Sequence, residues 1–215
     1  MKLGILGGTF NPIHLGHLRI AEEVRDRLKL DRILFLPAAT PPHKPLAGDL
    51  PFTERLAMVE LAIADNPAFV ASDLENRRQG PSYSVDTLAE LRLEYPGDEI
   101  YFIIGSDSFL EIGLWHRFDE IFPLCHLAVV ERPDAAIRDL ATVVPPTVAD
   151  DFTRYSADRL THRSGSHIFY LPGIPLAISS SAIRAMTAHG ESLRYLVPAA
   201  VIDYIEQKRI YANAG

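Results

Sequence analysis

The chain has 215 residues, a formal net charge of −7 and a single cysteine, Cys125. This length suits one domain with a substantial core, and the negative charge argues against general nucleic-acid binding, which uses a basic surface. One cysteine excludes an internal disulfide and fits a reducing compartment. The sequence contains no apolar run long enough to span a membrane and no signal-peptide pattern. We therefore expect a cytoplasmic protein without membrane contact.

The first thirty residues predict a strand, a loop and a helix. Residues 3–6 are apolar and indicate a buried strand, and residues 18–30 carry apolar side chains on one helical face. The loop at residues 7–17 lies where an open parallel sheet usually binds its ligand. Its glycines allow close backbone approach, and a helix start suits phosphate. His14 and His17 can donate hydrogen bonds to the same phosphate.

The spacing in this loop excludes two common phosphate-binding loops. No Lys-Ser/Thr pair follows the glycines, as it does in a P-loop, and the pattern is not the Gly-x-Gly-x-x-Gly of dinucleotide-binding proteins. A single histidine near a helix start is often an ordinary cap. Two histidines on either side of Gly16, directly after the first strand, favour a ligand site instead.

Strands and helices alternate along the chain, and this pattern predicts an α/β fold, a doubly wound parallel sheet with helices on both faces. We expect one domain, residues 1–215, with a C-terminal helical portion from about residue 178. Residues 134–165 have a weak pattern and suggest an insertion with a helix or two. The further strands are expected at residues 32–37, 69–72, 99–104, 127–130 and 168–171.

For three predicted helices we expect particular buried side chains or N-terminal caps. The helix at residues 53–64 should bury four apolar side chains and leave Arg55 on its surface as an ordinary charge. The next helix should be capped by Ser82 or Ser84, and a later one by the serines at 179–181, because serine is a good cap. The four apolar side chains are Leu56, Val59, Leu61 and Ile63.

Chemically useful side chains recur in the loops after the predicted strands. His43 and Lys44 follow the second strand, in a proline-rich loop that is either a surface connection or a substrate loop. Asp107 follows the fourth strand, where it can bond a ribose hydroxyl or cap the next helix. Trp115, the only tryptophan, is either a core residue or a surface for ring stacking.

These motifs, in this order along the chain, resemble the motifs of one family. Residues 7–17, Gly-Gly-Thr-Phe-Asn-Pro-Ile-His-Leu-Gly-His, resemble the signature of the nucleotidyltransferase α/β-phosphodiesterase superfamily, in the version of bacterial nicotinate mononucleotide adenylyltransferases. Pro-Pro-His-Lys at 41–44 resembles the substrate loop of the same enzymes. Gly-x-Asp at 105–107 matches the family at the same place.

Two further motifs resemble the family with one change each. Residues 78–84 are similar to its Arg-x-Gly-x-Ser-Tyr-Thr motif, with Ser84 in place of threonine. Residues 178–184 are similar to its second phosphate motif, Ile-Ser-Ser-Thr followed by Ile-Arg, with Ser181 in place of threonine. Both changes keep a hydroxyl, so we expect the function of each motif to be kept.

The resemblance implies adenylyl transfer from MgATP to nicotinate mononucleotide, which gives nicotinate adenine dinucleotide and pyrophosphate in NAD biosynthesis. The partners would be these two small molecules, with no nucleic acid and no membrane. Mg²⁺ would be held mainly by phosphate oxygens and water, as small hard cations often are, without a dedicated metal site in the protein.

The resemblance also implies a role for each matched residue. His14, His17, Lys44 and Arg184 would be catalytic, with His17 nearest the reacting α-phosphate. The implied ATP-binding residues are Gly7, Gly8, Thr9, Phe10, His14, Gly16, His17, Gly105, Asp107, Ile178, Ser179, Ser180, Ser181 and Arg184. The implied ligands of nicotinate mononucleotide are Gly8, Thr9, His43, Lys44, Ser82, Tyr83, Ser84 and Trp115, the tryptophan stacking on the pyridine ring.

Three alternatives stay open at the level of sequence. A pantetheine-phosphate adenylyltransferase or glycerol-phosphate cytidylyltransferase would leave the 78–84 motif and Trp115 unexplained. A nucleotide sensor without activity would not need His14, His17 and Arg184 together. A zinc site made by His14 and His17 with His43 lacks a supporting cysteine or carboxylate pattern. The oligomeric state is also open, a homo-oligomer included.

Overall fold

Eight strands form one sheet in the parts of the chain that the computed structural model describes, residues 1–41, 50–173 and 178–212. Their order is β3-β2-β1-β4-β5-β8-β7-β6. The first six strands are parallel, and the β8–β7 and β7–β6 pairs are antiparallel. The predicted parallel sheet is therefore confirmed, with an antiparallel extension at one edge. The strands are β1 (Lys2–Gly8), β2 (Arg32–Pro37), β3 (Phe69–Ala71), β4 (Glu99–Gly105), β5 (His126–Val130), β6 (Phe152–Ser156), β7 (Arg159–His162) and β8 (His167–Leu171).

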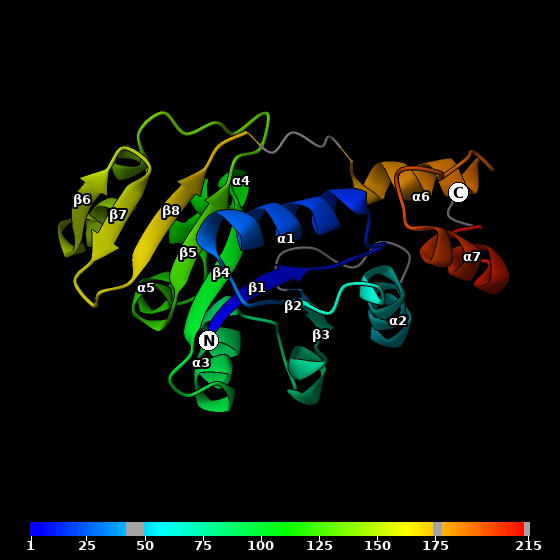
Figure 1. Ribbon diagram of the computed structural model, residues 1–215, viewed down its shortest axis with the longest axis horizontal. Helices are drawn as coiled ribbons and strands as arrows, with labels where there is room; N and C mark the ends of the chain where they lie inside the picture. The colour runs from blue at the N-terminus through cyan, green and yellow to red at the C-terminus, as the bar shows by residue number, and fades with distance from the viewer. Residues whose placement is uncertain (42–49, 174–177, 213–215) are drawn as a thin grey trace.

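Helices cover both faces of the sheet, as predicted. One apolar cluster joins the sheet to α1, α2, α6 and α7, and the other joins it to α3, α4 and α5. Figure 1 shows α6 and α7 next to α2 at one end of the molecule. The helices are α1 (Leu15–Leu28), α2 (Phe52–Ile63), α3 (Ser84–Glu94), α4 (Ser106–Leu110), α5 (Ile121–Leu124), α6 (Ser180–Ala188) and α7 (Ala199–Lys208). Short 3-10 helices are η2 (Leu74–Arg77), η3 (Ile112–Leu114), η4 (Phe118–Glu120), η5 (Leu140–Thr142) and η6 (Pro146–Asp151).

The side chains of β2 show how one strand supplies both clusters. Ile33 and Phe35 point to the α1 side, whereas Leu34 and Leu36 point to the α3 side. Successive side chains of a strand point to opposite faces, so a strand covered on both sides must be apolar throughout. This is why the central strands appear in the sequence as continuous apolar runs.

The prediction for residues 134–165 was incomplete, because the helices there are short 3-10 helices and two unpredicted strands accompany them. This stretch contains no α-helix; it forms η5, η6 and the antiparallel strands β6 and β7. All but the ends of β6 are exposed, and in β7 the buried positions are held by Leu160 and His162. An edge hairpin with polar residues at buried positions lacks the apolar alternation by which strands are recognised.

The inward face of α2 also differs from the prediction. Leu61 is 37% exposed, whereas Arg55 is fully buried. The buried positions lie at the helical spacing i, i+3, i+4, i+7 and i+8, counted from Arg55. The predicted buried face of α2, defined by apolar side chains alone, was therefore rotated about the helix axis relative to the observed one. The observed buried face includes a charged residue, Arg55.

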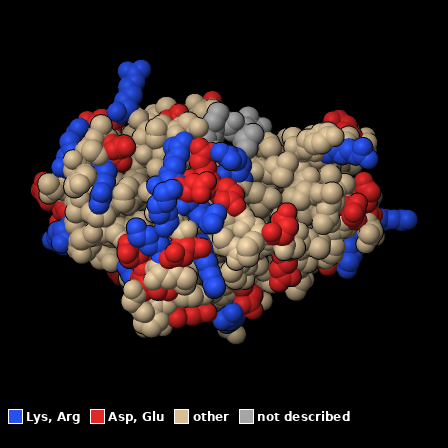
Figure 2. All heavy atoms as spheres, viewed as in Figure 1, with Lys and Arg blue, Asp and Glu red and all other residues tan. Residues whose placement is uncertain are grey.

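Charged side chains on the face that carries α1 are mixed in sign. Figure 2 shows Lys and Arg interleaved with Asp and Glu over this face. Glu23 pairs with Arg19 and Arg27, and Glu22 pairs with Arg25, at one helical turn along α1.

None of the helices in the described ranges is long and apolar enough to cross a membrane.

Candidate active site

The sheet reverses its order between β1 and β4. The chain runs from β1 to β2 and β3 on one side, and later to β4, β5 and β8 on the other. Ligands of open α/β sheets bind at such a switch point, beyond the carboxyl ends of the strands. A cavity of about 480 Å³ lies there, which we call the switch-point cavity, and its size is typical of a small-molecule site. Predicted residues that line it are Gly7, Gly8, Thr9, His17, Ser82, Ser84, Gly105, Asp107 and Trp115.

A second cavity, of about 460 Å³, lies beside the start of α6, and we call it the α6 cavity. His17, Asp107 and Arg132 line both cavities. The two cavities therefore share one wall, which we call the shared wall. A side chain of the shared wall can contact a molecule in either cavity. The other predicted residues that line the α6 cavity are His14, Ile178, Ser179 and Ser180.

The two histidines lie at the start of α1, which begins three residues earlier than predicted. Their rings stack with centroids 3.7 Å apart, and the backbone N–H of His14 donates to Nδ1 of His17 over 3.2 Å. A ring nitrogen that accepts a hydrogen bond carries no proton, so the neutral His17 ring has its proton on Nε2. A Cβ at Gly16 would lie 3.0 Å from Nδ1 of His14, so glycine leaves room for this stack.

Both histidines are held neutral in the free protein. Burial lowers the pKa of His14 to about 4, and the charge of Arg132 adds to this. Burial also lowers the pKa of His17 well below its usual range, with repulsion from a protonated His14 and from Arg132 as lesser causes. A polyanion bound nearby would raise both pKa values, because an opposite charge favours the charged form. The pair can therefore donate hydrogen bonds to phosphate and take up protons when phosphate binds.

Neither predicted serine caps α3. The helix begins at Ser84 with Tyr83 as its N-cap residue, and no side chain in the described ranges caps it. The Ser82 hydroxyl accepts a hydrogen bond from the N–H of Thr40 over 3.0 Å instead. Because no side chain of the described residues caps this helix start, its first-turn N–H groups are available within that part of the chain for an anionic group of a ligand.

Asp107 lies in the first turn of α4 and lines both cavities. Of the two predictions for it, capping is not realised, since the N-cap residue is Gly105 and no side chain of the described residues caps the helix. A side chain at Gly105 would collide with the Asp107 carboxylate. Glycine at this position thus allows the carboxylate to lie over the end of β4.

Trp115 is half-buried on the wall of the switch-point cavity. Its ring meets that of Phe102 edge-on, with centroids 6.4 Å apart. The next residue, His116, places its ring 4.3 Å from that of Tyr83, which precedes α3. The loop at Trp115 and the start of α3 therefore contact each other and form adjoining walls.

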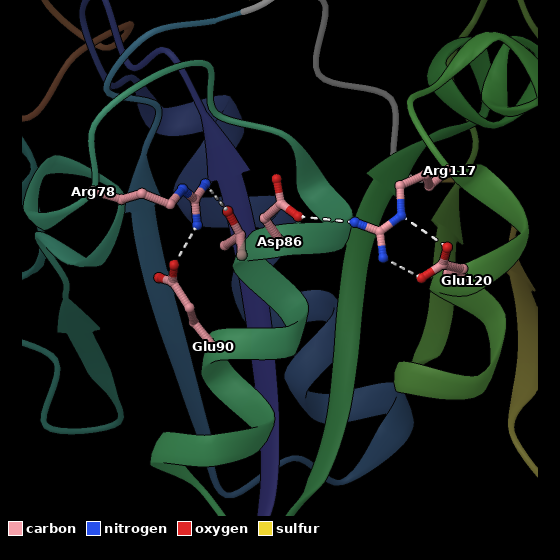
Figure 3. Close-up of polar contacts among 6 residues, drawn as sticks. Arg78, Asp86, Glu90, Arg117 and Glu120 are labelled. Atoms are coloured by element: carbon pink, nitrogen blue, oxygen red, sulfur yellow. Dashed lines mark hydrogen bonds and ion pairs between the residues drawn. The ribbon is translucent and has the colours of Figure 1, made fainter.

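Two arginines pair with acidic side chains of α3. Figure 3 shows Arg117 between Asp86 of α3 and Glu120, with Nη1 3.5 Å from the Asp86 carboxylate. In the same view Arg78 faces Glu90, and the two pair at 2.8 Å. The Arg117 pairs are half-exposed, and exposed ion pairs contribute little stability. The pair of Arg117 with Asp86 joins the start of α3 to the chain just after Trp115.

The start of α6 is bound to the first loop. Ser179 caps α6 as predicted, accepting a hydrogen bond from its first turn over 3.2 Å. Ser180 Oγ donates to the Pro12 carbonyl over 2.9 Å, and Nη1 of Arg184 donates to the Asn11 carbonyl over 2.8 Å. Two motifs far apart in the sequence, which were predicted to share the phosphates of ATP, are therefore in direct contact.

Some predicted site residues are placed elsewhere, and several polar residues that line the cavities were not predicted, namely Glu75, Thr87, Ser108, Arg132 and Asp134. His43 and Lys44 lie outside the described residues. Arg132 was not predicted, although a cation directly after β5 lies at the same edge of the sheet as the other loops. That position after a parallel strand was the signal that could have found it. Predicted residues that line neither cavity are Phe10, Gly16, Tyr83, Ser181 and Arg184.

Residues 5–186 match the family described as cytidylyltransferase-like. Two curated relatives, both called probable nicotinate-nucleotide adenylyltransferase, are similar over their full length. The one from Geobacter metallireducens is 60% identical, covering 99% of each chain, and the one from Geobacter sulfurreducens is 57% identical, covering 100% of each. The chain therefore belongs to the cytidylyltransferase-like family and, within it, to the nicotinate-nucleotide adenylyltransferases.

Solved structures agree on the fold. Nicotinic acid mononucleotide adenylyltransferase of Plasmodium falciparum, complexed with NaAD, superimposes with a TM-score of 0.75 at 18% identity, covering 98% of this chain and 97% of that one. A putative nicotinate-nucleotide adenylyltransferase of Vibrio parahaemolyticus gives 0.65 at 19% identity, covering 99% and 97%. At these identities the superpositions establish the fold alone.

Proposed function

We propose that the protein transfers the adenylyl group of MgATP to nicotinate mononucleotide, releasing pyrophosphate and forming nicotinate adenine dinucleotide for NAD biosynthesis. The observation that carries the proposal is the shared wall. A two-substrate transfer needs two adjoining sites with the reacting atoms between them, and His17, Asp107 and Arg132 lie between two cavities. Family membership agrees with this activity.

The acceptor mononucleotide takes the switch-point cavity. Its pyridine ring stacks on Trp115, and its carboxylate accepts hydrogen bonds from the open N–H groups at the start of α3. The amide form of the same compound would place an NH₂ group against these donors. A hydrogen bond to a charged group is worth roughly 1.5–3 kcal/mol, so the acid should be preferred about ten- to a hundred-fold in kcat/KM.

The phosphates of ATP extend into the α6 cavity. His14 and the serines at the start of α6 contact them there. Ser181 and Arg184, at the same end of the helix, also bind the phosphates. Asp107 accepts a hydrogen bond from the ribose. Arg132, on the shared wall, adds positive charge where both substrates bring phosphate groups.

The reaction is an in-line displacement. A phosphate oxygen of the mononucleotide forms a bond to the α-phosphorus of ATP, and the bond from that phosphorus to the oxygen bridging to the β-phosphate breaks. Pyrophosphate leaves with that oxygen and its electron pair. His17 donates from Nε2 to the α-phosphate as its charge redistributes, and no covalent enzyme intermediate is needed. His43 and Lys44, outside the described residues, would screen the incoming phosphate.

Mg²⁺ would enter the site with ATP. In the described residues no group of three or more His, Cys, Asp or Glu side chains is placed to hold a metal ion, and Asp107 is the one carboxylate on the shared wall. Phosphate oxygens and water suit Mg²⁺, which keeps several waters in most sites. Bound in this way it would neutralise charge on the outer phosphates.

An acceptor panel tests the proposal. The purified protein is given MgATP with nicotinate mononucleotide, its amide form, phosphopantetheine or glycerol phosphate, and pyrophosphate release is measured for each. We expect release with the acid, much less with the amide and none above background with the other two. Absence of release with the acid, from a protein that is folded by circular dichroism, would contradict the proposed function.

A further inference from the structure

The turn formed by residues 9–12, which we call the 9–12 turn, is held from behind by hydrogen bonds from distant parts of the chain. Nη1 of Arg55 in α2 donates to the Thr9 carbonyl over 2.8 Å. The Tyr211 hydroxyl, which follows α7, donates to Oδ1 of Asn11 over 2.6 Å in a buried contact. Ser180 and Arg184 donate to the same turn from α6, as described above. All of these groups act on one segment between β1 and α1.

The 9–12 turn needs such support. Phe10 has a backbone φ of 46°, in the left-handed region that side chains other than glycine rarely adopt. Conformations of this kind persist only where the surroundings determine them, and they cluster at functional sites. The Phe10 side chain is 1% exposed, so its place in the core and the hydrogen bonds around it fix the turn together.

Phe10 connects the turn to the shared wall. Its ring meets the ring of His17 edge-on, with centroids 5.0 Å apart and an interplanar angle of 77°. Phe10 also packs on Phe35 of β2, so it cannot move without moving its neighbours. The position of the 9–12 turn is therefore passed to the imidazole of His17 by direct ring contact.

The burial of Arg55 is not explained by packing. The residue is fully buried, and its Nε and Nη2 have no hydrogen-bond partner within the described ranges. No ion pair joins it to a carboxylate of those ranges. Burial lowers the pKa of Arg55, and the charges of Tyr211 and Glu75 oppose this only in part. A buried cation without a direct ion pair is destabilising, and an apolar residue of the same size would pack as well. Its bond to the Thr9 carbonyl and the contact of its guanidinium with the Phe52 ring, 5.5 Å from the ring centroid, distinguish arginine from such a residue here. Of the two contacts, only the bond to Thr9 acts on the 9–12 turn.

We propose that Arg55 and Tyr211 are positioning residues for the transfer reaction, which hold the 9–12 turn so that Phe10 orients the His17 ring toward the α-phosphate. Neither residue lines the switch-point cavity or the α6 cavity, and both are buried, unlike the partly exposed Arg184, so neither can touch a substrate placed there. Ser180 and Arg184 also hold the turn, but their proposed contact with ATP makes them unsuitable for separating the two roles. This inference rests on the proposed function.

The test compares Tyr211→Phe with a matched control, Tyr204→Phe. The Tyr204 hydroxyl also donates from the C-terminal region to α2, to Glu54 over 2.8 Å, but it does not touch the 9–12 turn. Loss of the Tyr211 hydroxyl should lower kcat roughly tenfold, because small misplacements of a catalytic group have large effects, and should leave both KM values within about twofold. The control should keep the kcat of the wild type.

Arg55→Met and Arg55→Lys provide the second arm, the lysine variant serving if the methionine variant does not fold. Lysine keeps the charge but lacks the planar donors, so we expect kcat to fall in both. Each variant is then combined with His17→Ala. Residues that act through one group are non-additive, so in that background Tyr211→Phe and the Arg55 variants should lower kcat no further.

Two outcomes would overturn the inference while leaving the proposed function intact. One is a wild-type enzyme that transfers the adenylyl group and whose kcat is unchanged by Tyr211→Phe and by both Arg55 variants. The other is an equal fall in kcat with and without His17, or in the Tyr204→Phe control, which would mark a general effect on the fold. A wild type inactive with MgATP and nicotinate mononucleotide would contradict the proposed function, and the inference with it.

Discussion

His17 has two nitrogens with separate tasks, and replacing them one at a time gives a sharp prediction. Nδ1 accepts the hydrogen bond from the backbone N–H of His14, and Nε2 carries the proton proposed to reach the α-phosphate. Asparagine can place its oxygen near the position of Nδ1 but has no donor near Nε2. Glutamine can place its amide N–H near Nε2 but offers no acceptor near Nδ1.

The structure gives a magnitude for each task. Loss of one charge-stabilising donor lowers kcat by roughly 10²–10³, equivalent to about 2.7–4 kcal/mol. Leaving the part-buried N–H of His14 without an acceptor costs about 1–3 kcal/mol, which in a domain of this size lowers Tm by about 2–4 °C for each kcal/mol. His17→Asn should therefore lose activity at near-normal Tm, His17→Ala should lose both, and His17→Gln should keep part of the activity at reduced Tm.

Single-turnover formation of pyrophosphate measures the chemical step for each variant, and thermal unfolding followed by circular dichroism gives Tm. The comparison between His17→Asn and His17→Gln matters most, because the two side chains are both amides and both neutral. If His17→Asn transfers the adenylyl group at a rate within a few-fold of the wild type, Nε2 is not the donor and the reasoning fails.

Three further predictions concern other parts of the site and the fold. Trp115→Ala should raise KM for nicotinate mononucleotide and for its amide in similar proportion, because ring stacking does not distinguish them; a selective loss of the acid would place the carboxylate contact at Trp115. Arg184→Lys should raise KM for ATP and lower kcat, since lysine lacks the forked geometry for phosphate; a change confined to KM of the mononucleotide would contradict this. Burial lowers the pKa of His14 and of His126 to about 4, so the unfolded chain binds their protons first as pH falls. The free energy of unfolding should therefore be highest above about pH 6.5 and fall between about pH 6.5 and 4, as urea titrations can measure; a flat profile in that range would show that these rings are not buried neutral.

The sequence by itself determined the elements whose signal is local. Both-sided burial makes a central strand apolar throughout, and the run at residues 32–37 therefore predicted the bounds of β2 without error. The motifs at the ends of the strands could be assigned to one edge of the sheet, because parallel strands bring their carboxyl ends together. The position of His17, Asp107 and Trp115 around one cavity follows from that rule.

Only the tertiary structure decided the features that depend on distant neighbours. Arg55 has the appearance of a surface charge in a helical pattern, and its burial depends on the Thr9 carbonyl, 46 residues away. The link from Tyr211 to Asn11 spans 200 residues and leaves no local trace in the sequence. Arg132 is an intermediate case, because its position after β5 could have indicated the edge of the sheet, whereas its place between the two cavities depends on the order of the strands. The spacing of apolar residues predicts which face of an element is buried, because apolar burial stabilises that face. A polar residue is buried only where a hydrogen-bond partner lies next to it, and the tertiary structure determines where that partner lies.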